Sequence, residues 1–381
     1  MVGGGFYALL GEVAGEAGLH TPIAIAFSGL LALVSAFSFA ELSSRFPSSA
    51  GEARYVQEAS GREALGAAVG WLVILTGVVS AAALSVATIQ FLQDFIQVSP
   101  YIGIPVLVLM MGMVAAWGIG SSVGVVTAIT LVEVGALAYV VVVANGSLAD
   151  VPERLPELIP AWDGAIWAGV FSGGFLAFYA FIGFEDMVNM AEEVRDVRST
   201  LPAAILISVI LATLLYVVVS LVAVLTVPPS QLATSNIPIA EIVSARGSYA
   251  TTGLGVVSLL TGLNGALVQI IMASRVAYGL ARRDQAPRWL GVVHPRTQTP
   301  LAATAVMTAV ILVLATFFPL ATLARATSSV MLVIFASVNL SLWKVKGRNP
   351  DPDGVGPRIP RWLPLIGSGV CVLVLLFQAV L

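Results

Sequence analysis

The feature that most constrains this chain is a succession of long apolar runs that recurs along almost its whole length. A run of about 20 apolar residues is long enough to cross a hydrocarbon core of ~30 Å as a helix. In lipid, a helix satisfies its own backbone polar groups, which an isolated strand cannot do. Only 10% of the residues are charged, whereas a soluble domain carries about 25%. The sequence therefore predicts an all-α integral membrane protein.

Eleven apolar segments are separated by polar residues, prolines or glycines. The expected segments are residues 1–17, 22–45, 64–95, 101–118, 123–144, 165–190, 202–227, 249–281, 301–319, 323–343 and 362–381. The polar stretches between them are loop-sized, so we expect a single membrane domain over residues 1–381. One cysteine and two histidines are too few for a metal cluster, and a net charge of −3 gives no sign of nucleic-acid binding. We therefore expect no cofactor and no nucleic-acid partner.

The basic residues set the expected orientation, because cytoplasmic loops are enriched in lysine and arginine. If the loop after the second segment is cytoplasmic, most basic residues fall on that side of the membrane. The residues that fall outside are Arg154, Arg246 and Arg325. We therefore expect a multi-pass protein of the plasma membrane whose first segment runs outward and whose sixth runs inward.

Glycines interrupt the hydrophobic pattern in the first and sixth segments, at residues 3–5 and at Gly183. The first and sixth segments lie five apart, so a repeat of five helices with inverted topology would place them in equivalent positions. Broken helices paired in this way mark the midplane substrate site of a transporter. The alternative is that glycine only permits close helix packing. We favour that alternative for Gly66, Gly70, Gly135 and Gly279.

Unwinding a membrane helix has a chemical consequence for what can bind there. It frees N–H and C=O groups, which lipid cannot satisfy, so these groups must face protein, water or a ligand. The N-terminus of a half-helix attracts an anionic group, and freed carbonyls attract a cationic one. A zwitterion such as an amino acid meets both demands.

Four motifs, in order, resemble those of the amino acid–polyamine–organocation (APC) permeases. Residues 3–11 (GGGFYALLG) are similar to the G-x-G-I-F-x-L-L-G signature of their first helix. Residues 41–52 (ELSSRFPSSAGE) are similar to their E-L-x-x-x-F-P-x-S-G-G-E loop, with Ala50 in place of a glycine. Residues 178–185 (FYAFIGFE), with a later EEV at 192–194, resemble helix six, and residues 274–296 resemble the exit of helix eight.

The resemblance implies a five-plus-five inverted-repeat transporter bundle with broken helices one and six. Residues 1–144 would form the first repeat, 165–343 the second, and 362–381 an extra peripheral helix. Members of the family have twelve or more spans where we count eleven. The chain also starts inside the broken part of helix one. A free ammonium at the midplane would be costly, so we expect a start placed too late or a fragment.

The resemblance also implies which residues bind the substrate. The backbone N–H groups of Gly3, Gly4 and Gly5 would take the substrate carboxylate. Its ammonium would go to the carbonyls of Tyr179, Ala180 and Ile182. Tyr179 and Phe181 would supply aromatic gating or cation–π contact, and Gly183, where the helix breaks, completes the substrate-binding set. Glu185 would link substrate binding to gate closure.

Glu133 lies in the middle of the fifth segment, where an acid is costly. In some members of the family a lysine near this place acts as a built-in cation or proton site, so we expect Glu133 to be a titrating proton carrier. A buried carboxyl bonded to a neighbouring helix is the equal alternative. Ser258 and Thr261 could join a sodium site, but such hydroxyls more often donate to their own helix. Sodium is therefore the less favoured ion.

The sequence as a whole indicates secondary active transport of amino acids by alternating access, either proton-coupled or by exchange. An enzyme is not expected, because we find no nucleophile–histidine pair, metal-ligand spacing or phosphate-binding loop. The alternative function is a non-transporting amino acid sensor or an inactive fragment of such a carrier. The expected partners are an amino acid, the bilayer and a proton. Aromatic and apolar residues near the site suggest a neutral substrate, with polyamines and cationic amino acids left open.

Overall fold

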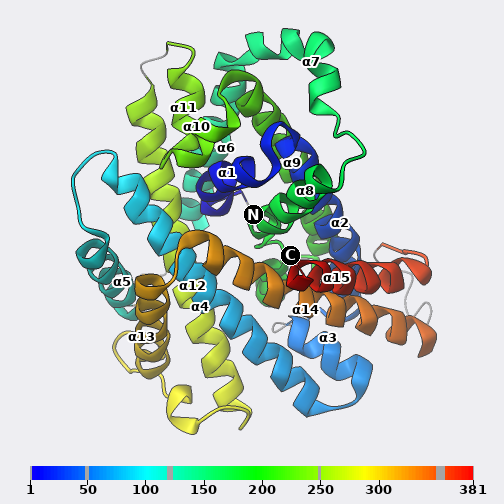
Figure 1. The fold of residues 1–381 in the computed structure, drawn as a ribbon. Helices are drawn as coiled ribbons and strands as arrows, with labels where there is room; N and C mark the ends of the chain where they lie inside the picture. The colour runs from blue at the N-terminus through cyan, green and yellow to red at the C-terminus, as the bar shows by residue number, and fades with distance from the viewer. Residues whose placement is uncertain (1, 48–50, 118–122, 248–249, 349–356, 381) are drawn as a thin grey trace.

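The computed structural model describes residues 2–47, 51–117, 123–247, 250–348 and 357–380. Within these ranges all regular structure is helical (Figure 1), so the all-α class predicted from the sequence is confirmed. Met1 and Ala50, which the sequence analysis singled out, lie outside the described residues.

Fifteen α-helices and five 3₁₀ segments make up the described structure. The α-helices are α1 (Gly4–Ala17), α2 (Thr21–Arg45), α3 (Gly51–Ser60), α4 (Glu63–Gln93), α5 (Pro100–Trp117), α6 (Val123–Val143), α7 (Val151–Leu158), α8 (Gly164–Ala177), α9 (Val197–Thr226), α10 (Pro229–Thr234), α11 (Pro238–Ser244), α12 (Thr251–Arg282), α13 (Leu301–Phe317), α14 (Leu320–Arg348) and α15 (Trp362–Val380). The 3₁₀ segments are Gly18–His20, Asn145–Asp150, Phe178–Phe181, Glu185–Glu193 and Arg288–Gly291.

Seven helical stretches of the described chain are long and apolar enough to cross a membrane. The first, Gly4–Arg45, contains both α1 and α2, and an eighth arises if Thr127–Val143 and the helix bent 57° from it count as one span. Helices α13 and α15 are apolar but shorter. With α1 and α2 taken separately and these two included, each of the eleven expected segments coincides with helical structure. The protein is thus a multi-pass membrane protein.

Four short helices, α3, α7, α10 and α11, lie in connections where the sequence analysis expected loops. Helix α3 packs against α4 and α14 and buries Tyr55 and Val56. These helices have 6 to 10 residues. Helices so short are marginal in water on their own, so tertiary packing holds them, which a search for long apolar runs does not detect.

Four of the five helix pairs that lie five apart among the first ten segments pack closely against each other, and α6 with α14 is the exception among the described residues. The pairs are α1 with α8, α2 with α9, α4 with α12, and α5 with α13. Long-range pairing of this kind interlocks the two halves of the chain and places the first and sixth segments side by side near the centre (Figure 1). It is the packing that a five-helix repeat predicts, although the repeat boundaries themselves stay a prediction.

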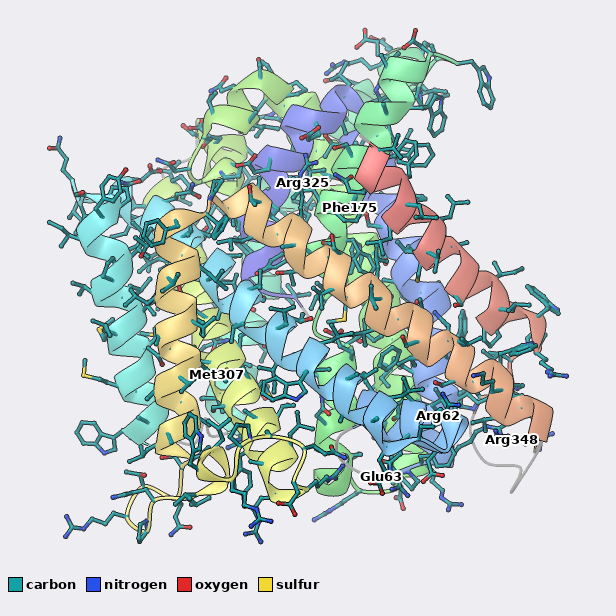
Figure 2. The ribbon with its side chains drawn as sticks, turned by 60° about the horizontal axis from the view of Figure 1, so that its bottom comes forward. Arg62, Glu63, Phe175, Met307, Arg325 and Arg348 are labelled. Carbon is teal, nitrogen blue, oxygen red and sulfur yellow. The ribbon has the colours of Figure 1, made fainter. Side chains whose placement is uncertain are left out.

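The two ends of the bundle differ in charge in the way that the sequence predicted. Figure 2 shows Arg325 at one end of the molecule and Arg62 and Arg348 at the other. At the latter end the buried Glu41 of α2 accepts hydrogen bonds from Arg45 Nη2 at 2.6 Å and from Lys346 Nζ of α14 at 2.7 Å. Its second oxygen accepts from the backbone N–H of Ile359 at 3.1 Å. This network ties α2, α14 and the chain entering α15 together.

Candidate functional site

The sixth segment is broken where the sequence predicted. Helix α8 ends at Ala177, a 3₁₀ turn follows, and Ile182 is extended with ψ 140°. Gly183 then adopts φ 123°, a conformation that residues with a Cβ rarely adopt. The chain resumes as a 3₁₀ segment at Glu185. The main chain at the break is therefore outside regular helix in the middle of a membrane segment.

The N-terminus of α1 meets this break. Gly3 is extended and precedes the first helical residue, Gly4, so the N–H groups of the first turn have no partner within the helix. A Cβ on Gly5 would lie 3.1 Å from the Tyr179 ring and 3.3 Å from the Cα of Ala180. Gly3 has open space around it. The structure thus brings the positive end of a helix dipole against the unwound residues.

Aromatic side chains join the first segment, which is a continuous helix from Gly4 to Ala17, to the break in the sixth. The Tyr179 hydroxyl lies 2.9 Å from Ser80 Oγ and donates to the Ser80 carbonyl of α4 at 3.1 Å. Phe181 contacts the Tyr216 ring edge-on at 5.4 Å between centroids, and Phe6 stacks on the other side of Tyr216 at 4.1 Å. Tyr216 of α9 therefore bridges α1 and the break. Sequence reasoning missed it, because a tyrosine within an apolar run gives no sign of the direction in which it points.

The space beside the break is small and apolar. It measures about 10 Å³ and is lined by residues of α1, α2 and the broken segment, among them Phe6, Leu10, Ile25, Ala180 and Phe181. A volume of this size holds one water molecule at most. This space therefore has no room for an amino acid, and we refer to this arrangement of α1 and the break as the closed form.

Glu133 of α6 lies beside the start of α1 and is buried, with 2% of its surface exposed. The Tyr7 hydroxyl donates to its backbone carbonyl at 2.7 Å. Its side chain lies beside the Thr261 side chain of α12, while its Oε1 atom has no hydrogen-bond partner among the described residues. The carboxyl thus contacts a neighbouring helix, as one alternative held, but keeps one buried oxygen without a partner.

The hydroxyls considered for a sodium site are already engaged. Ser258 donates to the Leu254 carbonyl at 2.9 Å and Thr261 donates to the Val257 carbonyl at 2.8 Å. Both bonds run back along α12, as is common for hydroxyls in membrane helices.

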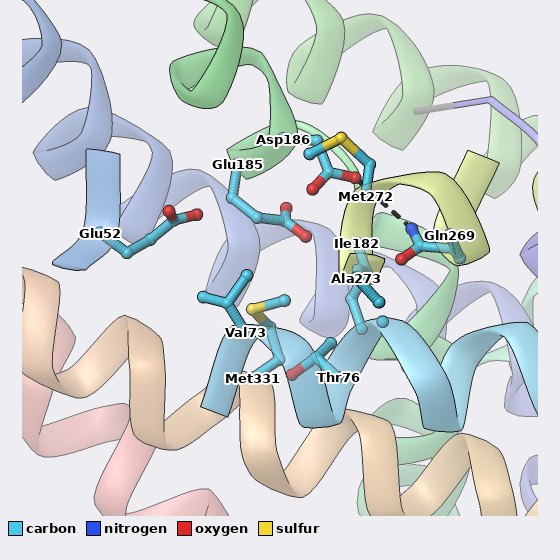
Figure 3. Close-up of a pocket in the computed structure, with 11 residues that line it drawn as sticks. Glu52, Val73, Thr76, Ile182, Glu185, Asp186, Gln269, Met272, Ala273 and Met331 are labelled. Carbon is cyan, nitrogen blue, oxygen red and sulfur yellow. Dashed lines mark hydrogen bonds between the residues drawn. The ribbon is translucent and has the colours of Figure 1, made fainter. Parts of the chain in front are cut away.

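A second small cavity lies on the side of the break that the basic residues predict to be cytoplasmic. It measures about 20 Å³ and is lined by acids of two elements together with Gln269 of α12. Figure 3 shows the carboxylates of Glu52, Glu185 and Asp186 around this space. Glu185 accepts the N–H of Gly183 at 2.8 Å, and Asp186 accepts from Gln269 at 3.4 Å. Glu185 thus holds the residue that breaks the helix.

Glu52 was not among the predicted site residues, although it closes the loop motif at 41–52. It lies on α3 and has 2% of its surface exposed. Burial raises the pKa of the Glu52 carboxyl to about 8; a backbone hydrogen bond at Glu52 lowers it, and the nearby charge of Asp186 raises it. A titratable acid therefore contacts the broken helix from the cytoplasmic side.

Comparison with known proteins places the chain in one family over its whole length. The amino acid permease family matches residues 1–381. An uncharacterized transporter of Mycobacterium tuberculosis is 30% identical over 376 residues, which are 98% of this chain and 81% of the relative. A branched-chain amino acid permease of Bacillus subtilis is 26% identical, covering 92% of this chain and 79% of the relative.

A vacuolar cationic amino acid transporter of Arabidopsis thaliana is 28% identical, covering 93% of this chain and 62% of the relative. Relatives named as transporters point to transport rather than catalysis, and bacterial transporters among them indicate the plasma membrane. The broken sixth segment, its contact with α1 and the match over the full length agree with the resemblance seen in the sequence. The chain belongs to the amino acid permease family of the APC superfamily.

Proposed function

We propose that this protein carries amino acids across the membrane by alternating access, with the substrate held between the start of α1 and the break after α8. The observation that carries the proposal is the contact of Gly5 with Tyr179 and Ala180. This contact puts free N–H groups beside an unwound backbone. A carboxylate on the N–H groups of residues 3–5 and an ammonium on the carbonyls of residues 179–182 would satisfy both.

The lining of the space beside the break favours a substrate with a neutral, apolar side chain. Phe6, Leu10, Ile25 and Phe181 surround it. A cationic side chain placed there would lose its hydration without gaining a counter-charge, which is costly. Relatives are named for both branched-chain and cationic amino acids, so the family alone does not choose between them. The lining supports the branched-chain class.

Glu133 is the proposed proton carrier. The Thr261 hydroxyl has a single proton, and it lies within donating distance of the Val257 carbonyl as well as beside Glu133. A protonated Glu133 can donate to Thr261 while Thr261 donates to Val257, which leaves only the uncharged oxygen Oε1 without a partner. An ionised Glu133 would instead compete for that proton and would keep a bare buried oxygen. The closed form therefore favours a bound proton.

Glu185 is the proposed link between substrate and cytoplasmic closure. Its bond to the N–H of Gly183 fixes the residue that follows the proposed ammonium-binding carbonyls. A ligand that moves Ile182 or Gly183 must therefore disturb Glu185 and its neighbours Glu52 and Asp186.

Counterflow in proteoliposomes tests the proposal, because it requires alternating access but no knowledge of the coupling ion. Vesicles are loaded with mixed amino acids and offered one trace-labelled amino acid at a time, with unloaded vesicles as the control. We expect transient accumulation of labelled branched-chain amino acids in the loaded vesicles alone. Binding of a label without counterflow would support the sensor alternative, and accumulation of cationic amino acids alone would contradict the substrate class.

A further inference from the structure

A groove rich in basic residues lies at the cytoplasmic end of the bundle, away from the substrate site. It has a volume of about 500 Å³ and runs between the start of α4 and the end of α14. We call it the basic groove. The residues that matter for its chemistry are Arg62, Leu65, Trp343, Lys344, Arg348 and Arg361. Figure 2 shows Arg62 and Arg348 at this same end of the molecule.

The four cations of the basic groove have no acidic partner within it. Among the residues that the structure describes, no carboxylate lines the groove, and no ion pair involves any of the four. The acids nearest in sequence lie elsewhere: Glu58 pairs with Arg54 at 2.5 Å, and Glu63 begins α4 outside the lining. Four like charges that share one groove repel each other, so a bound anion would stabilise them.

One of the cations is held in place before any ligand binds. The Arg361 guanidinium lies over the Trp343 ring, with 5.1 Å between its Cζ and the ring centroid. It also lies directly against Gly347, where a Cβ would be 2.6 Å from Nη2. A guanidinium ordered in this way presents its planar fork to an oxyanion and loses little side-chain freedom on binding.

The location of the groove points to a lipid rather than to a soluble anion. Leu65 on its rim is 44% exposed, and Trp362, which follows Arg361, is 59% exposed. Exposed tryptophan beside exposed leucine is typical of the membrane–water boundary. Binding of a free phosphate does not require an apolar rim. A phospholipid does use one, because its acyl chains lie on the apolar side of the rim and its headgroup lies on the basic side.

We propose that the basic groove binds the headgroup of an anionic phospholipid of the cytoplasmic leaflet. The phosphate lies among Arg62, Arg348 and Arg361, with Lys344 beside it, and the acyl chains extend past Leu65. Because the groove joins α4 from the first half of the chain to α14 from the second, the lipid strengthens the packing of the two halves at the cytoplasmic end.

The test uses the full chain in a nonionic detergent and measures the unfolding temperature during titration with phosphatidylglycerol or phosphatidylcholine. We expect phosphatidylglycerol to raise the unfolding temperature more than phosphatidylcholine. A cation near a membrane surface strengthens binding of anionic lipid roughly fivefold, so Lys344→Gln/Arg348→Gln weakens the response to phosphatidylglycerol about 25-fold. The matched control, Arg282→Gln/Arg283→Gln, removes two exposed cations from the end of α12, outside the groove lining, and is expected to weaken the response to phosphatidylglycerol much less than the groove variant does.

Three outcomes would overturn the proposal. Equal responses to the two lipids would remove the charge preference, and equal losses in both double variants would show attraction by the whole surface rather than by a groove. An increase in unfolding temperature with inorganic phosphate as large as with phosphatidylglycerol would indicate a soluble anion. If the first double variant does not fold, Arg62→Gln/Arg361→Gln decides the matter. Asp351 and Asp353 lie outside the described residues. If their carboxylates neutralised the cations of the basic groove, phosphatidylglycerol and phosphatidylcholine would raise the unfolding temperature equally.

Discussion

At the residue scale, Gly5 is the position where the geometry of the proposed site is tightest. Any added methyl group meets the Tyr179 ring at 3.1 Å and the backbone of Ala180 at 3.3 Å. We predict that Gly5→Ala pushes α1 away from the break and lowers counterflow roughly tenfold, since overpacking by a methylene typically costs about 1–3 kcal/mol.

The control for that substitution is Gly135→Ala on α6, where a Cβ has nothing within 4 Å. Alanine is the better helix former there, so we expect counterflow and protein yield to stay at the wild-type level. Equal counterflow by Gly5→Ala and Gly135→Ala would show that the close approach of α1 to the break does not matter for transport.

The prediction for Glu133 concerns the proton gradient that drives uptake, because the proposed role of this residue is to carry a proton rather than to bind the amino acid. We predict that Glu133→Gln keeps counterflow but loses the uptake that an imposed pH gradient drives, since glutamine cannot carry a proton. Uptake is measured in proteoliposomes with the interior alkaline and with both sides at equal pH. Glu153→Gln on the outer helix α7 is the control. Gradient-driven uptake that survives in Glu133→Gln would rule out this proton carrier.

The residues of the proposed site differ in how far the sequence could predict them. Residues 3–5 and 178–185 stand out because they combine glycines, aromatics and an acid inside apolar runs, and the structure brings both groups together. Tyr216 and Glu52 belong to the same region but carry no comparable local signal. Their positions depend on how α9 and α3 pack against the break, which is a tertiary property.

At the scale of elements, α3 places a buried acid against the broken helix and so links stability to pH. The pKa of Glu52 is raised to about 8 from an ordinary value of 4.5, so the folded form keeps a proton that the unfolded chain releases. Its stabilising contribution is fully present below pH 4.5 and is lost as pH rises through about 8. We predict that the unfolding temperature falls over this interval and that Glu52→Gln makes the fall shallower.

The pH series needs a control on the same helix. Glu58→Gln changes an acid of α3 that is paired with Arg54, with 35% of its side chain exposed, and we expect its pH profile to follow the wild type. Scanning fluorimetry from about pH 4 to pH 9 spans both pKa values used here. Parallel profiles for wild type and Glu52→Gln would contradict a buried, protonated Glu52.

At the scale of elements, the hydrogen bonds and ion pairs of Glu41 hold α2 against α14. The Glu41 and Lys346 side chains are 3% and 9% exposed, respectively, so removal of the carboxylate leaves Lys346 and Arg45 without compensation. We predict that Glu41→Gln lowers the free energy of unfolding by about 3–5 kcal/mol, the usual cost of breaking a buried pair. Glu58→Gln breaks the more exposed pair with Arg54 and should cost under about 1 kcal/mol. Similar unfolding temperatures for the two variants would contradict a structural role for the network.

The elements themselves were largely predictable from hydrophobic run length. A membrane helix must be long, apolar and internally hydrogen-bonded, so each of the eleven expected segments coincides with helical structure. The ends were less predictable: α9 begins at Val197, five residues before the expected start at Pro202, and α14 continues to Arg348. Polar residues at the membrane boundary can continue a helix into water, so polarity alone does not mark where it ends.

At the scale of the whole molecule, the pairing of α1 with α8, α2 with α9, α4 with α12 and α5 with α13 explains why the start of the first segment meets the break in the sixth. Hydrophobicity gave the number of segments but not their partners, since every apolar run can pack against any other. Of these partners, the expectation of a five-helix repeat indicated only that segments one and six lie together. That expectation came from the matching positions of the glycine-rich breaks and from the resemblance to a known family.

The central claim is that substrate binds between the start of α1 and the break, and cysteine protection tests it most directly. Gly3 is extended, with φ −176°, and has open space around it, so it accepts a cysteine. The buried Cys371 is first changed to alanine. The measurement is the rate at which a small thiol reagent modifies Gly3→Cys/Cys371→Ala in proteoliposomes, using a variant that still performs counterflow.

The account predicts that the transported amino acid slows this modification severalfold at saturation, because its carboxylate covers residue 3. A cysteine at Gly253, on the exposed outer part of α12 with open space around it, should react at a rate that the amino acid does not change. An unchanged rate at position 3 under saturating substrate would contradict the account, because it would place the substrate away from the N-terminus of α1.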